Sequence, residues 1–559
     1  MIATVVVTIV LAVLFTFSSA IKLLGVPQSL AIRDHLGVTP MLWRVIGILE
    51  LAGVVGVLVG LAWAPPIGVA AAIGLALLSV GAVAFHVRAS DGWAKTAPAV
   101  LAIVLAVSTA ILPSELLVLP AELARVDALL DDPVFFAPFA AHFDARIGRP
   151  SIPVETYLRL MFLKFRHRLG YELLCREVAD SISWQRFCRI PLGTRVPHPT
   201  TLMKITSRCG DAAVAGLNEA LVTKAAAAKL LRTDRVRVDT TVVEADVGYP
   251  TDSGLLANAV STLSRSVVRI KTLGGATRTR VRDRRRSAGR RARSIASKLR
   301  LRGAQQRDEA QAAVRRITGE LADIAEASMR DAAAVVGNAR RAWCTATGVR
   351  RGRLAQAINH LDTVLERTEK VVAQTRSRLA GVMPESAHRV VSLHDVDARP
   401  IRKGRLGKPV EFGYKAQVVD NADGIILDHT VELGNPADAA QLAPAIERIV
   451  DRAGRPPRAV TADRGYGLAS VEQDLHRLGV RTVAIPRMSK PGTARRQFEH
   501  RRAFRNKIKW RTGSEGRINH LKRSYGWNRT ELTGLSGART WCGHGVFAHN
   551  LVKISTLAA

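Results

Sequence analysis

The stretch Arg-Val-Arg-Val-Asp-Thr-Thr-Val-Val-Glu-Ala-Asp, residues 235–246, is dominated by β-branched residues around Asp239. This composition predicts a short strand that holds the Asp239 carboxylate on a rigid support. A second stretch, Arg-Ala-Val-Thr-Ala-Asp-Arg-Gly-Tyr-Gly at residues 458–467, predicts a strand that ends at Asp463, just before a glycine turn. The end of a strand is a favoured place for a functional acid.

A third stretch, Arg-Thr-Gly-Ser-Glu-Gly-Arg-Ile-Asn-His-Leu-Lys at residues 511–522, predicts a helix. Arg511, Glu515 and Lys522 are four and then seven residues apart, so they share one helix face. A carboxylate flanked by two cations stays ionised and lies where phosphates can be bound.

Three carboxylates suit metal-dependent chemistry on a phosphodiester. Nucleophile and ester are both negative, and two divalent metals about 3.5–4 Å apart offset this repulsion. Magnesium prefers a few hard oxygen ligands and leaves the rest of its shell to water and phosphate. The chain has 47 acidic residues, so any one of the three alone is a weak candidate, and the prediction depends on the set.

The order Asp, Asp, Glu, with Arg-x3-Glu-x6-Lys in the last block, resembles the RNase H-like DDE transposases of bacterial insertion sequences. The resemblance covers about residues 115–559 and includes Gly-Leu-Leu-Ala-Asn after the first acid, residues 409–429, residues 434–442 and the segment 541–551. Relatives often carry a Tyr three residues before the Arg, where this chain has Ile508. The finer subgroup therefore stays open.

The resemblance implies that Asp239, Asp463 and Glu515 are catalytic and bind Mg²⁺ or Mn²⁺, while Arg511 and Lys522 contact phosphate. It also implies cleavage at the element ends, followed by attack of the freed 3′-hydroxyl on target DNA. The expected partners are both DNAs and a second copy of the chain, as a homodimer assembled on DNA.

The segments around these acids predict a mixed α/β catalytic core at residues 231–253 and 391–559. Apolar periodicity and turn residues predict strands at 410–420, 425–431 and 481–486 and helices at 437–453 and 469–479.

Between the two parts of the core lies a long insertion, residues 254–390. Heptad-like apolar positions, among them Ile317, Leu321, Leu361 and Leu365, predict two long helices packed as a coiled-coil-like hairpin, with the turn at 337–352. Hydrophobic packing explains this apolar stripe without any further function.

The insertion begins with a basic run. Residues 276–302 contain twelve Arg or Lys residues and one acid, in a chain with a net charge of +34 and a pI near 11.1. A run of like charge is usually a solvated surface, but this net charge favours binding to phosphates, without sequence specificity. The candidate phosphate-binding residues in the run are Arg284, Arg285, Arg286, Arg290, Arg291 and Arg293.

Residues 113–230 predict a helical DNA-binding domain that recognises the element ends. Residues 152–190 carry helix-period apolar residues interleaved with Arg and Lys, and Thr200 or Thr201 could cap a second helical unit. This region resembles the N-terminal domain of the same transposases. A helix-turn-helix and a bundle that only packs on the catalytic core remain alternatives.

Residues 1–112 have the composition of a membrane domain. Four apolar stretches, near 2–21, 42–64, 66–87 and 96–112, approach the ~20 residues of a membrane span. They predict an all-α four-helix membrane segment. Residues 17–25, 47–61 and 81–91 resemble small DoxX-like membrane proteins, a resemblance that implies no particular chemistry.

The loop charges of this segment place both chain termini outside the cell by the positive-inside rule, whereas a transposase acts on DNA in the cytoplasm. A fusion of two unrelated genes is the preferred explanation, and retention or misinsertion are the others. Two alternative functions also remain: a catalytically inactive DNA-binding remnant, or a membrane protein that carries a transposase passenger.

Overall fold

The computed structural model describes residues 2–111, 118–143, 152–300, 304–405 and 407–558. The chain divides into two compact units. One comprises Met1–Asp127 and Cys175–Val196, and the other comprises Ala128–Leu174 and Pro197–Ala559. The predicted boundary after residue 112 and the end of the basic run at Arg302 lie outside the described residues.

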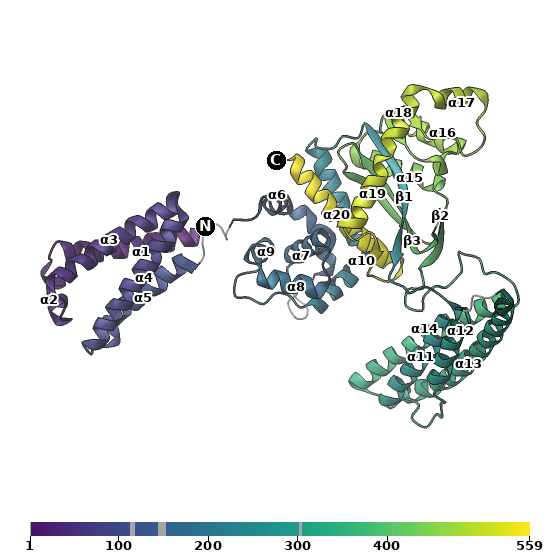
Figure 1. Cartoon of the computed structure of the whole chain (residues 1–559), viewed down its shortest axis with the longest axis horizontal. Helices are drawn as coiled ribbons and strands as arrows, with labels where there is room; N and C mark the ends of the chain where they lie inside the picture. Colours follow the sequence, from purple (N-terminus) through teal and green to yellow (C-terminus); the bar gives the residue numbers. More distant parts are fainter. Residues whose placement is uncertain (1, 112–117, 144–151, 301–303, 406, 559) are drawn as a thin grey trace. The chain divides into compact units, whose positions relative to one another are not determined.

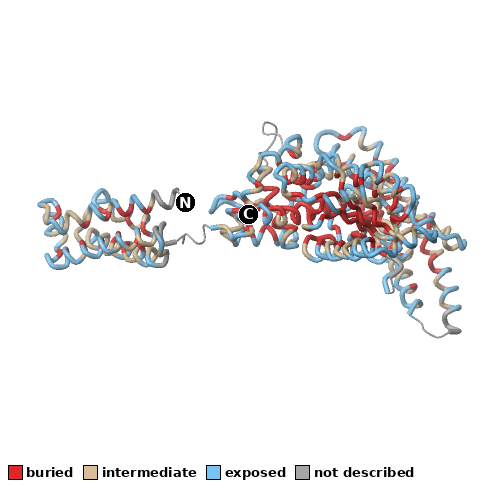
Figure 2. Tube along the Cα trace, turned by 90° about the horizontal axis from the view of Figure 1, so that it is seen from above, coloured by how far each residue is buried: buried red, intermediate tan, exposed pale blue. Residues whose placement is uncertain are grey.

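The N-terminal helices α1 (Ile2–Leu23), α3 (Pro40–Ala62), α4 (Pro65–Arg88) and α5 (Trp93–Ile111) form a bundle, with α2 (Pro27–His35) after α1 (Figure 1). Its core is small and is built from residues such as Leu11, Phe15 and Leu75. Figure 2 shows few buried positions in this segment. Large apolar side chains such as Phe17 and Leu77 face outward, being 68% and 67% exposed, as expected for helices in contact with lipid.

Helices α3 and α4 approach each other closely through small residues. A Cβ added at Gly60 would lie 2.2 Å from the Cα of Gly68, and one at Gly56 would lie 2.7 Å from the Cβ of Ala71. Small residues that let helix backbones approach are typical of packing inside membranes.

The prediction of four membrane spans is wrong for the described residues, where only Pro40–Leu61 and Ile67–Arg88 are long and apolar enough on their own. Val7–Leu23 continues into Pro27–His35 through an 87° bend, and this pair counts as a third span only if it is taken as one broken span. The apolar part of α5, Trp93–Val107, is too short. The reason is geometric, because apolar composition does not reveal the break before Pro27 or the shortness of the fourth helix.

The next helices are α6 (Ala121–Leu130), α7 (Val154–His167), α8 (Tyr171–Asp180), α9 (Ile182–Phe187) and α10 (Pro199–Ala227). Helix α10 packs on the C-terminal helix α20 (Gly534–Leu557), and Asn218 Nδ2 donates a hydrogen bond of 3.0 Å to the Gly543 carbonyl oxygen. The cap predicted at Thr200 or Thr201 is wrong. His198 caps α10 instead, because its imidazole accepts a hydrogen bond from the Thr200 backbone N–H.

The larger unit contains a mixed sheet with strand order β2-β3-β1-β5-β6, in which β4 also pairs with β3 and β7 with β1 (Figure 1). Strand β1 is antiparallel to β3 and parallel to β5. The bounds are β1 (Arg235–Ala245), β2 (Arg399–Arg405), β3 (Lys408–Asn421), β4 (Ile426–Glu432), β5 (Ala459–Thr461), β6 (Thr482–Ala484) and β7 (Arg529–Thr530).

The predicted strands, hairpin and helices of this core are present, with α15 at Ala439–Ala453 and α16 at Ala469–Arg477. Strands β2 and β7 were not predicted. Gly424 makes the hairpin turn between β3 and β4 with a φ of +80°, a conformation that favours glycine. Three further helices follow β6: α17 (Thr493–His500), α18 (Arg502–Arg511) and α19 (Gly513–Ser524).

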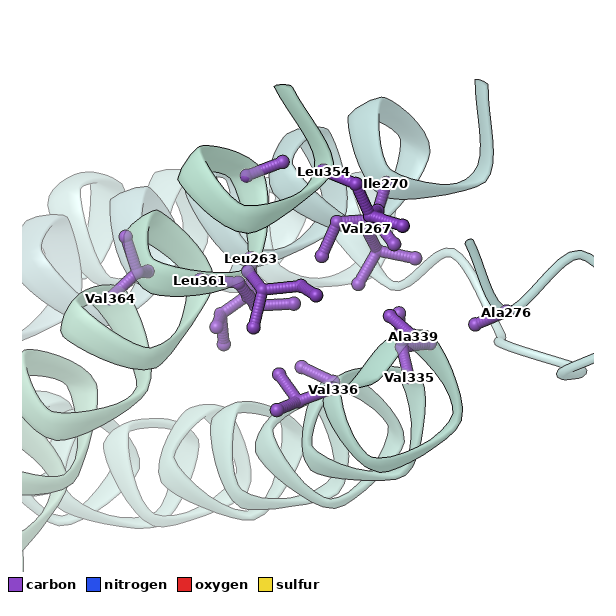
Figure 3. Packing of buried hydrophobic residues seen from close by; sticks show 13 residues of the cluster. Leu263, Val267, Ile270, Ala276, Val335, Val336, Ala339, Leu354, Leu361 and Val364 are labelled. Carbon is purple, nitrogen blue, oxygen red and sulfur yellow. The ribbon is translucent and has the colours of Figure 1, made fainter. Parts of the chain in front are cut away.

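The insertion is a bundle of four helices rather than the predicted two: α11 (Asp252–Thr272), α12 (Arg285–Lys298), α13 (Ala304–Cys344) and α14 (Gly348–Leu379). The long hairpin of α13 and α14 is present, but its turn is limited to residues 345–347, because α13 continues through residues that were assigned to the turn. Figure 3 shows how α11, α13 and α14 share a core around Leu263, Val336 and Leu361.

Candidate active site

Asp239 and Asp463 extend from the same end of two neighbouring parallel strands. The pairing of β1 with β5 ends at Arg237 opposite Thr461, and each acid lies two residues beyond that pair. Asp239 continues within β1, where it pairs with Val418 of β3. Asp463 caps the short 3-10 helix η4 (Arg464–Tyr466), and its Oδ1 accepts a hydrogen bond of 2.9 Å from the Gly465 N–H.

Arg511 connects Asp239 with Glu515. Its Nη1 donates to Asp239 Oδ2 at 3.1 Å, and its Nη2 donates to Glu515 Oε1 at 3.3 Å. The predicted single helix is interrupted at Thr512, so Arg511 ends α18 and Glu515 begins α19. The three side chains nevertheless meet, because the two helices join beside β1.

Gly513 allows this close approach. Arg237 Nη1 donates a hydrogen bond of 3.2 Å to the Trp510 carbonyl oxygen, and a Cβ added at Gly513 would lie 2.1 Å from the same Nη1. Arg237 is in turn held by Asp420 of β3, through bonds of 2.9 Å from Nε and 2.7 Å from Nη2. The buried pair of Arg237 and Asp420 thus fixes the place where α19 starts.

The three carboxylates influence one another electrostatically. Burial raises the pKa of Asp239 to about 6, against the opposing effects of the Thr240 N–H and Arg511, and the negative charges of Asp463 and Glu515 raise it further. Asp239 is buried, whereas the Glu515 side chain is 66% exposed. The charges of Asp463 and Glu515 reach Asp239, so the structure places all three predicted acids in one region.

These residues fit a divalent metal in kind. They supply only hard oxygen donors, and a bound cation would relieve the repulsion that raises the pKa of Asp239. Within the described ranges, no group of three His, Cys, Asp or Glu side chains has the spacing to hold a metal ion. Arg511 lies between Asp239 and Glu515, so closure around a metal requires it to release one of them.

A fourth acid, Asp438, was not predicted. Its Oδ2 and Asp463 Oδ1 are both 3.1 Å from the position of a Cβ at Gly465, and its Oδ1 is 2.7 Å from Lys415 Nζ. Burial, followed by the charges of Asp438, Asp239 and Asp463, raises the pKa of Tyr466 well above its usual value. The sequence offered only a position, since Asp438 lies in the segment 434–442 that carries the resemblance.

Lys522 lies in the last turn of α19 and is partly buried. Its positive charge acts on the Cys542 thiol of α20, opposing the burial that raises the pKa of that thiol. The predicted contact of Lys522 with phosphate stays a prediction.

The six arginines predicted to bind phosphate fall into two groups. Three are paired with acids: Arg284 with Asp331 at 2.5 Å, Arg285 with Asp283 at 2.8 Å and Arg291 with Glu320 at 3.0 Å. The other three, Arg286, Arg290 and Arg293, are exposed, share one face of α12 and line a surface hollow with Asp283, Arg285 and Gly289. This face of α12 is the better candidate for contact with nucleic acid.

Two basic residues of the predicted DNA-binding region are internal. Arg159 is buried and bonded to Asp131 at 2.7 Å and Glu155 at 3.0 Å. Lys164 is also buried, 4.4 Å from the ring centroid of Trp541. Both contribute to packing, and the helix-turn-helix reading stays a prediction.

Comparison with known families divides the chain into three matched segments. Residues 6–109 match the DoxX-like family, residues 115–208 match a transposase domain (DUF772), and residues 392–551 match a transposase DDE domain. No curated protein and no solved structure matches the chain significantly. The chain therefore carries a DoxX-like N-terminal region followed by two transposase domains, as the two resemblances predicted.

Proposed function

We propose that residues 115–559 form an RNase H-like DDE transposase in which Asp239, Asp463 and Glu515 hold a pair of Mg²⁺ or Mn²⁺ ions. The observation that carries the proposal is the position of Asp239 and Asp463 at the same end of adjacent parallel strands, with Glu515 joined to Asp239 through Arg511. When bound, the metal pair activates the attacking oxygen and stabilises the leaving oxygen of the phosphodiester.

The protein's own groups have different roles in this proposal. Asp239 and Asp463 are held by the sheet, so they form the fixed part of the site. Glu515 is exposed at the start of α19 and completes the site when Arg511 releases it. Arg511 then has a guanidinium free to bind a DNA phosphate in a bidentate manner, and Lys522 is proposed to contact phosphate further along α19.

We infer the wider setting from the same assignments. The exposed face of α12 with Arg286, Arg290 and Arg293 contacts DNA without sequence specificity, and residues 113–230 recognise the element ends. Two copies of the chain assemble on DNA. The DoxX-like region associates with the membrane, and the transposase region acts on DNA in the cytoplasm.

The test compares the full-length protein with Asp463→Asn on a labelled duplex that carries the DNA flanking the reading frame. We expect strand cleavage in Mg²⁺ or Mn²⁺ by the unsubstituted protein only, with equal DNA binding by both proteins in fluorescence anisotropy. Cleavage retained by Asp463→Asn would refute the assignment. Binding without metal-dependent cleavage in the unsubstituted protein would favour the inactive DNA-binding remnant.

The DoxX-like match favours a second proposal, that the chain is a fusion of two genes. N-terminal sequencing of the species that binds DNA in cells tests it. The fusion acts as one polypeptide if only the full-length chain is found, whereas a start after residue 112 would show that the transposase is made separately.

A further inference from the structure

The N-terminal bundle encloses a cavity of about 1250 Å³. Most of its lining is apolar and includes Leu14, Phe15, Leu75 and Phe85. This volume is at the upper end of the range for small-molecule sites, and such sites combine an apolar wall with a few polar groups. The cavity lies wholly within the N-terminal unit and is independent of the carboxylates of the transposase region.

An ion pair lines the cavity. Lys22 of α1 and Glu50 of α3 are joined at 2.5 Å, with side chains 12% and 7% exposed. Glu50 lies near the middle of the candidate span Pro40–Leu61. Ionisable residues inside membrane spans are costly and rare, and they usually mark a binding or transport site.

The ion pair leaves one hydrogen-bond acceptor without a partner. Glu50 Oε1 accepts hydrogen bonds from Lys22 Nζ at 2.5 Å and from Ser18 Oγ at 3.3 Å. Glu50 Oε2 is buried and has no hydrogen-bond partner in the part of the chain that the structure describes. A buried oxygen without a donor is destabilising by about 1–3 kcal/mol, so a ligand that donates to Oε2 gains this energy.

Lys22 supplies the complementary donor. An ammonium group has three N–H donors, and Ser18 Oγ and Glu50 Oε1 engage two of them. The Lys22 ammonium also lies 5.3 Å from the ring centroid of Trp43, another lining residue. Because the charges of Lys22 and Glu50 balance, a charged ligand would bring an uncompensated charge into an apolar cavity. The head group that fits is neutral and both donates and accepts.

We propose that this cavity binds a lipophilic alcohol or phenol. Its hydroxyl group donates to Glu50 Oε2 and accepts from Lys22 Nζ, and its apolar body lies along the aliphatic and aromatic wall. The ligand class follows from the unpartnered acceptor, the balanced ion pair and the apolar volume together.

The experiment uses the full-length chain in lipid nanodiscs and two probes, 2-bromo-4-octylphenol and its methyl ether. The ether has the same apolar body but lacks the hydrogen-bond donor. Bromine beside the head group quenches tryptophan fluorescence at short range, and Trp43 reports binding because it lies against Lys22. Trp43→Phe identifies the part of the quenching that comes from this residue.

We expect the phenol to bind at least tenfold more tightly than the ether. In the double variant Lys22→Met with Glu50→Leu, the two probes should bind with equal affinity, because the apolar volume remains and the polar pair is lost. Equal affinity in the unsubstituted protein would overturn the proposal, as would discrimination retained by the double variant. Quenching unchanged in Trp43→Phe would show partition into lipid only. The first comparison needs no folded variant.

Discussion

Replacing Asp239 by Asn should stabilise the metal-free protein. In the folded protein the pKa of Asp239 is about 6, against an ordinary value of 3.8, chiefly because the carboxyl is buried. The folded state therefore holds this proton more tightly than the unfolded state, so stability falls as pH rises from 3.8 to 6. Asn resembles the protonated acid in shape and cannot ionise, so it removes this loss.

The magnitude follows from the difference of 2.2 between the two pKa values, which corresponds to about 3 kcal/mol at pH 7. The side chain is only 13% exposed, so little of this energy is screened by solvent. At pH 5 the carboxyl is already largely protonated in the folded state, and the advantage of Asn falls to roughly half, about 1.6 kcal/mol.

The assay is pulse proteolysis in urea with EDTA present, at pH 7 and pH 5, on the full-length chain and on Asp239→Asn. Glu515→Gln is the matched control, because this exposed carboxylate contacts the same arginine and should change stability by no more than about 0.5 kcal/mol. An Asn variant that is less stable at pH 7, or a gain that does not shrink at pH 5, would refute the reasoning.

Three further predictions concern the surroundings of the site and the basic helix. Asp420→Ala leaves the buried Arg237 without its carboxylate, so we expect a loss of about 3–5 kcal/mol in the same proteolysis assay; an unchanged stability would show that Arg237 finds another partner. Gly513→Ala places a Cβ 2.1 Å from Arg237 Nη1, which should cost about 1–3 kcal/mol and lower strand cleavage, whereas Gly516→Ala, with open space around its Cβ position, should leave cleavage intact; equal effects of the two would contradict the close approach. Substituting Arg286, Arg290 and Arg293 together by Ala should reduce the salt dependence of DNA binding, log K against log salt concentration, by roughly 2–3, and the matched triple at Arg284, Arg285 and Arg291, which are paired with acids, should reduce it less; the reverse order would show that the wrong face of α12 was chosen.

Local patterns predicted much of the catalytic sheet. Arg235, Arg237 and Asp239 alternate with valines along one strand, so the sequence indicates both the strand and the face of its acid. Strand β2, Arg-Pro-Ile-Arg-Lys-Gly-Arg, was missed because its proline, glycine and four basic residues are typical of loops. Only its pairing with β3 makes it a strand.

Long-range contacts explain the other differences. The basic run forms helix α12 because Asp331 and Glu320, both on α13, offset part of its charge, and no local pattern reveals these partners. Similarly, Asp420 is 183 residues from Arg237, so their joint role in positioning α19 is visible only in three dimensions. The identities of the three acids were predictable, whereas the position of Arg511 between Asp239 and Glu515 was not.

The insertion also has a consequence for synthesis on the ribosome. Strand β1 pairs with β3 through Asp239 and Val418, which are 418 − 239 = 179 residues apart, so at 5–20 residues per second β1 waits about 10–35 s for its neighbour. The four-helix bundle has cores of its own and is complete before β3 emerges. It can therefore fold during translation and bring the two ends of the interrupted sheet together, which shortens the search that β1 and β3 must make and limits the time in which an unpaired apolar strand can aggregate.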